Sequence, residues 1–179
     1  VHAGSGVSFG PGFISPFIKW MLIANVGVFV LQNFFPWIDS AMGFTPARFL
    51  RDPLNSFYQP FTYMFLHGSV SHILFNMLSL WMFGSEVERI LGVRRFLTLF
   101  FTAGIFAGIC CCVFTPWTPI LGASGPIFAI EVAFAMYFPN TTVIFYFFPV
   151  KAKYLVMIFA GITIFNCVVP KGGNVAHFA

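Results

Sequence analysis

The sequence is poor in charged residues. They make up only 8% of this 179-residue chain, whereas a soluble globular domain usually carries about 25%. Hydrophobic residues account for 59% and include 27 phenylalanines. This balance excludes an ordinary soluble domain and predicts an integral membrane protein, and the length suits a single domain.

Three further patterns are missing. The net charge of +4 comes from nine Lys and Arg that are scattered and form no basic stripe, which argues against nucleic-acid binding. Three of the four cysteines are consecutive in an apolar run, and neighbours in a helix cannot pair easily, so we expect no disulfide framework. No Cys-x-x-Cys spacing with paired histidines is present, so we expect no metal site.

The two ends of the sequence also lack familiar signals. The chain starts at Val1 without an initiator methionine and stops at Ala179, where a helix is beginning. We therefore expect a single domain over residues 1–179 that belongs to a longer protein and is truncated at its C-terminus. No small-x-small site follows the first apolar run, so we expect no cleavable signal peptide.

Long apolar runs are the most abundant feature of the chain. A membrane helix needs about 20 mostly apolar residues. The runs predict an all-α membrane protein with helices over residues 14–35, 60–83, 96–114, 124–138 and 154–169, and the start of a sixth helix near residue 175. The fourth run is too short to span alone, so we expect the loop before it to dip into the bilayer beside a polar cavity.

The connections between the runs carry the orientation signal. Six Lys and Arg lie on the N-terminal side of the membrane against three on the other side, which predicts a cytoplasmic N-terminus. Residues 86–95 are expected to form a charged turn between the second and third helices. Gly104 and Gly108 form a Gly-x-x-x-Gly motif that permits close helix packing in the third.

Ser124 is the most informative residue, because it lies between Gly122-Ala123 and Gly125 at the start of the fourth run. We expect Ser124 to be the N-cap of that helix, with Pro126 in the first turn, where proline is tolerated. A plain capping role is the common explanation for such a serine. A helix start also offers backbone N–H groups that can stabilise an oxyanion, which favours a catalytic role.

Polar residues in the second run offer possible partners for Ser124. His72 and Asn76 are four residues apart and share a helix face, so both could donate hydrogen bonds to one negative oxygen, or simply hold helices together. His67 lies about 140° from His72 around an ideal helix, which predicts that it stays off that face and has a structural or water-holding role.

His177 begins the sixth predicted helix and could accept the Ser124 proton. No carboxylate is a clear third member of a triad. Glu131 falls two turns after Ser124 on nearly the same face, and we expect it to have a structural role. The simplest interpretation is a Ser–His dyad.

Several of these motifs occur together in one family. The chain resembles the rhomboid family of intramembrane serine proteases, and the resemblance covers nearly the whole sequence. It rests on the His67 to Asn76 run, on the segment from Gly84 through Glu88 to Gly92 followed by Arg95-Phe96, on Gly122-Ala-Ser124-Gly125 and on Ala176-His177.

The resemblance implies a rhomboid-like polytopic helix bundle and no cofactor. It implies Ser124 as nucleophile, His177 as general base, and His72, Asn76 and the Ser124 backbone N–H as the oxyanion site. Glu88 would anchor the connection after the second helix, and Phe128 stands where some members carry Tyr.

The implied function is cleavage of membrane-anchored proteins in or near their transmembrane segments. We expect a multi-pass protein of a bacterial inner membrane. The alternatives are a catalytically inactive rhomboid-like protein that binds membrane proteins, and an unrelated channel or carrier.

Overall fold

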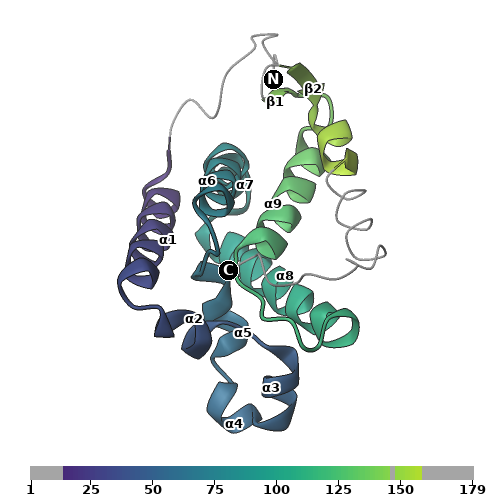
Figure 1. Cartoon of the computed structure of the whole chain (residues 1–179). Helices are drawn as coiled ribbons and strands as arrows, with labels where there is room; N and C mark the ends of the chain where they lie inside the picture. The colour runs from purple at the N-terminus through teal and green to yellow at the C-terminus, as the bar shows by residue number, and fades with distance from the viewer. Residues whose placement is uncertain (1–13, 146–147, 159–179) are drawn as a thin grey trace.

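The computed structural model describes residues 14–145 and 148–158. This part of the chain is predominantly helical, as predicted (Figure 1). The longer helices are α1 (Pro16–Phe34), α6 (Val70–Ser79), α8 (Val93–Phe114) and α9 (Ser124–Tyr137). Shorter helical segments are α2 (Trp37–Met42), α3 (Pro46–Arg51), α4 (Pro53–Ser56), α5 (Gln59–Thr62), the 3₁₀ turn η1 (Tyr63–Phe65), the π-helical turn η2 (Leu80–Gly84) and α7 (Ser85–Leu91).

Local sequence signals explain where two long helices begin and end. The Ser15 hydroxyl accepts the Ile18 N–H at 3.1 Å, and Pro16 occupies the first turn of α1. Pro139 follows the end of α9 closely, which limits any extension of that helix. The predicted bounds of the first, third and fourth helices agree with α1, α8 and α9 to within three residues.

The prediction of one helix over residues 60–83 is wrong. The chain there forms α5 and η1, breaks at residues 66–69, and restarts as α6. The Ser69 hydroxyl accepts the His72 N–H at 3.2 Å and caps α6. A capping serine inside an apolar run therefore divides a segment whose hydropathy is continuous.

The predicted charged turn at residues 86–95 is also wrong in its extent. Residues 85–91 are helical as α7, where Arg89 pairs with Glu86 one turn away. Gly92 ends the helix with a φ of +75°, a conformation that glycine adopts readily. Arg94 and Arg95 already belong to α8.

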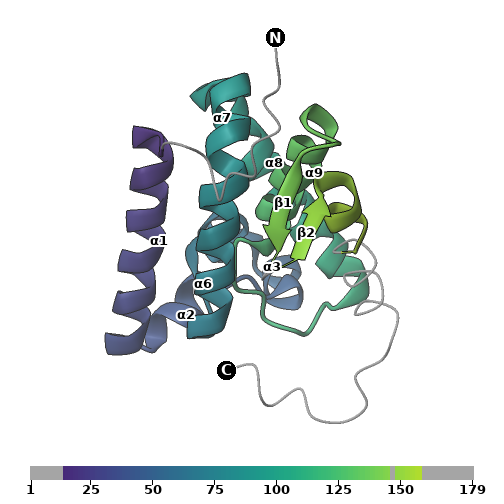
Figure 2. The ribbon, with the colours of Figure 1, turned by 90° about the horizontal axis from the view of Figure 1, so that it is seen from above.

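Figures 1 and 2 show the arrangement of the long helices. In both views α6 and α7 lie between α1 and α9, and α8 packs against α9. The buried core between these helices includes Ile18, Leu80, Phe96, Phe100 and Ile130. The segment from α2 to α5 lies at the opposite end of the molecule from the hairpin (Figure 1).

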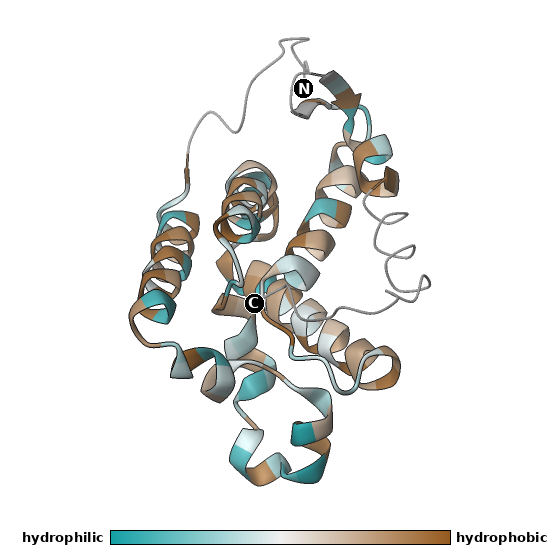
Figure 3. Ribbon diagram, in the orientation of Figure 1, coloured by the Kyte–Doolittle hydropathy of each residue, from teal (hydrophilic) through white to brown (hydrophobic). Residues whose placement is uncertain are grey.

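Two helices of the described part, α1 and α8, are long and apolar enough to cross a membrane, and α9 is apolar but shorter. Figure 3 shows hydrophobic colouring along these three helices and hydrophilic patches at α3. The fifth predicted span is described only as a helix over residues 152–158, and the sixth lies outside the described residues. A short antiparallel hairpin, β1 (Thr142–Phe145) and β2 (Phe148–Lys151), joins α9 to this helix and was not predicted.

Candidate active site

Ser124 lies at the start of α9, but it is not the N-cap that the sequence predicts. Ala123 occupies the cap position, no side chain caps this end, and Ser124 is the first helical residue. The first backbone bond of α9 runs from the Ile127 N–H to the Ala123 carbonyl at 2.9 Å. The Ser124 hydroxyl is therefore not used for capping, and the N–H groups of the first turn have no acceptor within the helix.

Gly122 brings the chain before Ser124 against His72. Its φ is +123°, and a Cβ added to Gly122 would lie 2.5 Å from Cε1 and 2.7 Å from Nε2 of His72. Real carbon atoms do not approach so closely, so only glycine permits this contact. The His72 imidazole of α6 is thereby placed beside the backbone two residues before Ser124.

Asn76 lies one turn after His72 on α6. Its side chain is buried, with 7% of its surface exposed. The amide nitrogen Nδ2 has no hydrogen-bond acceptor among the described residues. Buried polar groups normally have a partner, so this donor is available for a group that enters the site.

His67 contacts the His72 ring, contrary to the prediction from helix geometry. The two rings meet edge to face, with centroids 5.3 Å apart. The 140° estimate fails because α6 begins only at Val70, so His67 is not part of the helix. His67 is 2% exposed, and neither ring nitrogen has a partner in the described part of the chain.

Gln32 of α1 holds the backbone of His67 and was missed by the sequence analysis. Its Oε1 accepts the His67 N–H at 3.0 Å, and its Nε2 donates to the His67 carbonyl at 3.2 Å. Nε2 also donates to Asp39 Oδ1 at 2.6 Å. A buried amide within an apolar run is costly unless it has a hydrogen-bond partner, and that signal could have drawn attention to Gln32.

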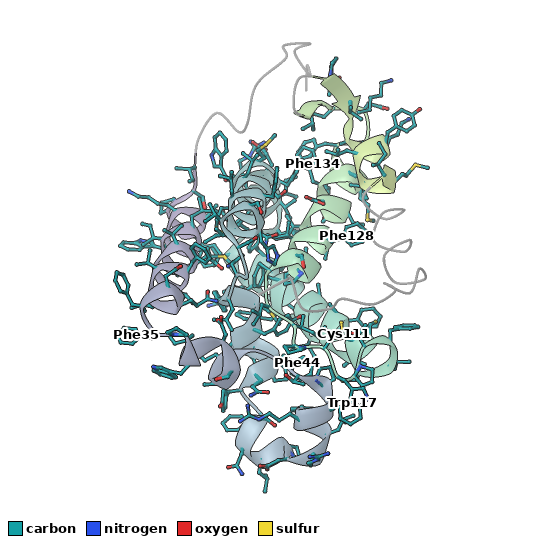
Figure 4. All side chains as sticks on the ribbon, in the orientation of Figure 1. Phe35, Phe44, Cys111, Trp117, Phe128 and Phe134 are labelled. Atoms are coloured by element: carbon teal, nitrogen blue, oxygen red, sulfur yellow. The ribbon has the colours of Figure 1, made fainter. Side chains whose placement is uncertain are left out.

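The loop from residue 115 to 123 is tied to the α2–η1 segment at three points. The Phe44 and Ile120 backbones exchange two hydrogen bonds, of 3.2 and 2.8 Å, and the Ala47 N–H donates to the Pro116 carbonyl at 2.8 Å. The Gly122 N–H donates to the Tyr63 carbonyl at 2.9 Å. Figure 4 labels Phe44 and Trp117 in this region. The loop that leads to Ser124 is therefore fixed by a segment more than 50 residues earlier.

The sequence model of the Rhomboid domain family matches residues 54–179, which is more than half of the chain. The chain belongs to the rhomboid family. It is 48% identical over 63 residues to the Rhomboid protease GluP of Bacillus subtilis, a match that covers 35% of this chain and 12% of that protein.

Two other relatives extend the comparison of this rhomboid. It is 30% identical over 122 residues to the Rhomboid protease GlpG of Klebsiella pneumoniae, covering 64% of this chain and 41% of that protein. It is 36% identical over 90 residues to the mouse Presenilin-associated rhomboid-like protein, mitochondrial, covering 48% of this chain and 24% of that protein. The chain thus spans less than half the length of each of these relatives.

The remaining predicted residues of the rhomboid site lie on α7 and α9. Gly125 faces α8, where an added Cβ would lie 2.7 Å from Ala107 Cβ, so the motif glycine permits close packing. Phe128 is half-buried, one turn after Ser124 on α9 (Figure 4). The Glu88 carbonyl accepts the Gly92 N–H at 2.7 Å and ends α7, while the predicted anchoring role of Glu88 stays a prediction.

Glu131 is buried between α9 and α6, with 6% of its surface exposed. Its carboxyl group interacts with the hydroxyl of Ser79, which lies one turn after Asn76. The structural role that we expect for Glu131 stays a prediction. His177, the predicted base, lies outside the described residues.

Proposed function

We propose that this rhomboid is an intramembrane serine endopeptidase. The observation that carries the proposal is the contact between His72 and Gly122, since it sets a hydrogen-bond donor beside the start of α9. Ser124 begins that helix without a capping role, and Asn76 offers a second, unpartnered donor among the described residues. These groups match the parts that acyl transfer to serine requires.

In the proposed reaction, Ser124 Oγ attacks the carbonyl carbon of the scissile peptide bond and its proton passes to His177. The Ser124 N–H, His72 and Asn76 donate hydrogen bonds to the negative oxygen of the tetrahedral intermediate. The C–N bond then breaks as His177 returns the proton to the leaving amine. Water, activated by His177, hydrolyses the resulting ester and restores the serine. No cofactor takes part.

The proposed substrates are membrane-anchored proteins cut in or near their transmembrane segments. A site that lies among apolar helices reaches such segments without taking them out of the bilayer. The largely apolar surfaces of α1 and α8 suit a location in the lipid bilayer.

We also propose that the N-terminus is cytoplasmic and that the membrane is the bacterial inner membrane. Lys19 near the start of α1, Arg94 and Arg95 at the start of α8, and Lys151 and Lys153 after α9 support this orientation. The matches to rhomboid proteases of Bacillus subtilis and Klebsiella pneumoniae support a bacterial membrane. A cysteine replacing Asn55 should react with a membrane-impermeant thiol reagent from outside the cell. If Asn55→Cys is instead protected and Lys19→Cys reacts, the N-terminus lies outside.

The oxyanion site gives the sharpest test of the proposed function within the described residues. His72→Ala and Asn76→Ala in the full-length protein should each lower kcat for a model transmembrane substrate by about 10²–10³-fold. The physical reason is the loss of a donor that acts mainly on the charged intermediate. Turnover at saturating substrate, measured in lipid vesicles, checks the prediction.

Asn33→Ala provides the matched control, because Asn33 is an exposed amide of α1 that donates to the Phe29 carbonyl of its own helix. Its kcat should equal that of the wild type. If both site variants turn over at the wild-type rate, His72 and Asn76 merely hold helices together. A full-length wild type that cuts no membrane substrate would instead point to an inactive rhomboid-like binding protein.

A further inference from the structure

Tyr63 connects η1, in which it lies, to the loop before Ser124 and to α8. It is 2% exposed. Its backbone carbonyl accepts the Gly122 N–H at 2.9 Å, and its phenolic hydroxyl donates to the Gly104 carbonyl of α8 at 2.7 Å. One residue therefore connects the loop before Ser124 to the helix that packs against α9.

Gly104 of α8 also lies close to residues of η1 and α9. A Cβ added to Gly104 would lie 2.2 Å from Met64 Cε and 3.1 Å from Pro126 Cγ. Gly104 thus touches the residue after Tyr63 and also the first turn of α9. We call the group formed by Tyr63, Met64, Gly104, Gly122 and Pro126 the Tyr63 junction.

Two residues of the Tyr63 junction flank Ser124 in the sequence. Gly122 precedes the serine by two residues and Pro126 follows it by two, and both are buried. The Ser124 side chain is exposed among the described residues and forms no capping bond. The position of its oxygen therefore depends on how firmly the backbone on either side is held.

We propose that Tyr63 is a positioning residue for the nucleophile, and that its hydroxyl sets the place of Ser124 through Gly122 and α8. This inference rests on the proposed serine protease function. The proposed role of Tyr63 is indirect, because its hydrogen bonds go to the Gly122 and Gly104 backbones and not to Ser124. Its hydroxyl fixes the ring against α8, and the ring fixes the backbone carbonyl that holds Gly122.

Tyr63→Phe removes the hydroxyl and keeps the ring, so it isolates this bond. Without this hydrogen bond, the Gly104 carbonyl loses a buried donor and the η1 backbone gains freedom to shift. Small displacements of a nucleophile slow the reaction strongly, because a misplacement of about 1 Å can lower the rate by about 10²-fold. We expect kcat to fall by about tenfold, with KM for a transmembrane substrate unchanged within about twofold.

Tyr58→Phe is the matched control. Tyr58 belongs to the same connection, and its hydroxyl also donates to a backbone carbonyl, that of Ala41 at 3.1 Å. Its hydrogen bonds in the described part of the chain reach none of the junction residues. A purely structural contribution would affect both variants alike. We expect Tyr58→Phe to retain the wild-type kcat.

A second variant changes the α8 side of the Tyr63 junction. Gly104→Ala should force Met64 and Pro126 apart and again lower kcat more than it changes KM, whereas Gly27→Ala, whose added Cβ meets nothing within 4 Å, should leave both constants unchanged. All variants are compared as full-length protein in lipid vesicles, with the folded fraction determined by gel filtration and thermal unfolding.

The outcomes separate this inference from the proposed function. A fall in kcat for Tyr63→Phe and Gly104→Ala, with normal controls, supports the positioning role. An active wild type with Tyr63→Phe at the wild-type kcat overturns it, as does an equal loss in Tyr58→Phe, and leaves the protease function intact. An inactive wild type overturns the protease function itself.

Discussion

Replacing Ser124 with alanine in the full-length protein is expected to abolish cleavage of a membrane-anchored substrate. Without the nucleophile, no acyl-enzyme forms, and kcat should fall by at least about 10⁴-fold. The fold should survive, because the Ser124 hydroxyl is exposed and caps no helix in the described part of the chain. Cleavage of a fluorescent transmembrane substrate in vesicles measures the loss, and thermal unfolding measures the fold.

Ser40→Ala is a suitable control for this experiment, since Ser40 is an exposed serine of α2 whose hydroxyl donates to the nearby Trp37 carbonyl. It should cleave like the wild type. Cleavage by Ser124→Ala at the wild-type rate would show that another residue is the nucleophile.

Gly122→Ala is also expected to lower kcat strongly, although it adds a single methyl group. The added Cβ would lie 2.5 Å from His72 Cε1 and 2.7 Å from His72 Nε2, so the imidazole or the loop must move. The φ of +123° adds backbone strain of about 1–3 kcal/mol. Because either movement displaces a proposed oxyanion donor from the serine, we expect kcat to fall by about 10²-fold or more.

Gly92→Ala is the control that separates the effect of the steric clash with His72 from the effect of backbone strain. Gly92 also has a positive φ, of +75°, but an added Cβ there meets nothing within 4 Å. Gly92→Ala should lower the free energy of unfolding by about 1–3 kcal/mol and leave kcat unchanged. If Gly122→Ala and Gly92→Ala have the same kcat, the contact between Gly122 and His72 has no part in catalysis.

The sequence allowed α9 to be placed almost to the residue, because its limits depend on local chemistry. Pro126 suits a first helical turn, and Pro139 limits extension beyond the end. The low charge of the chain likewise predicted the membrane class. These features require no knowledge of distant parts of the chain.

The errors arose where local composition and tertiary structure disagree. The run over residues 60–83 is apolar throughout, yet Ser69 caps a new helix inside it. That break removes His67 from the helix and lets its ring reach His72. A fixed angle per residue could not reveal this contact, because it holds only within one continuous helix.

The contacts that assemble the site are long-range and leave little trace in the sequence. Gln32 lies 35 residues before His67, and Gly104 lies 41 residues after Tyr63. The glycine motif predicted that Gly122 matters, but its role in admitting His72 follows from the fold. Only the polarity of Gln32 within an apolar helix hinted at such a contact.

The most direct test of the central claim is labelling of Ser124 by a fluorophosphonate probe in the full-length protein. The account predicts that the wild type is labelled at Ser124 and that His177→Ala is not, because the serine is a weak nucleophile without its base. Peptide mapping identifies the modified residue. A wild type that stays unlabelled, or labelling of His177→Ala at the wild-type rate, would contradict the Ser–His dyad on which the proposed function depends.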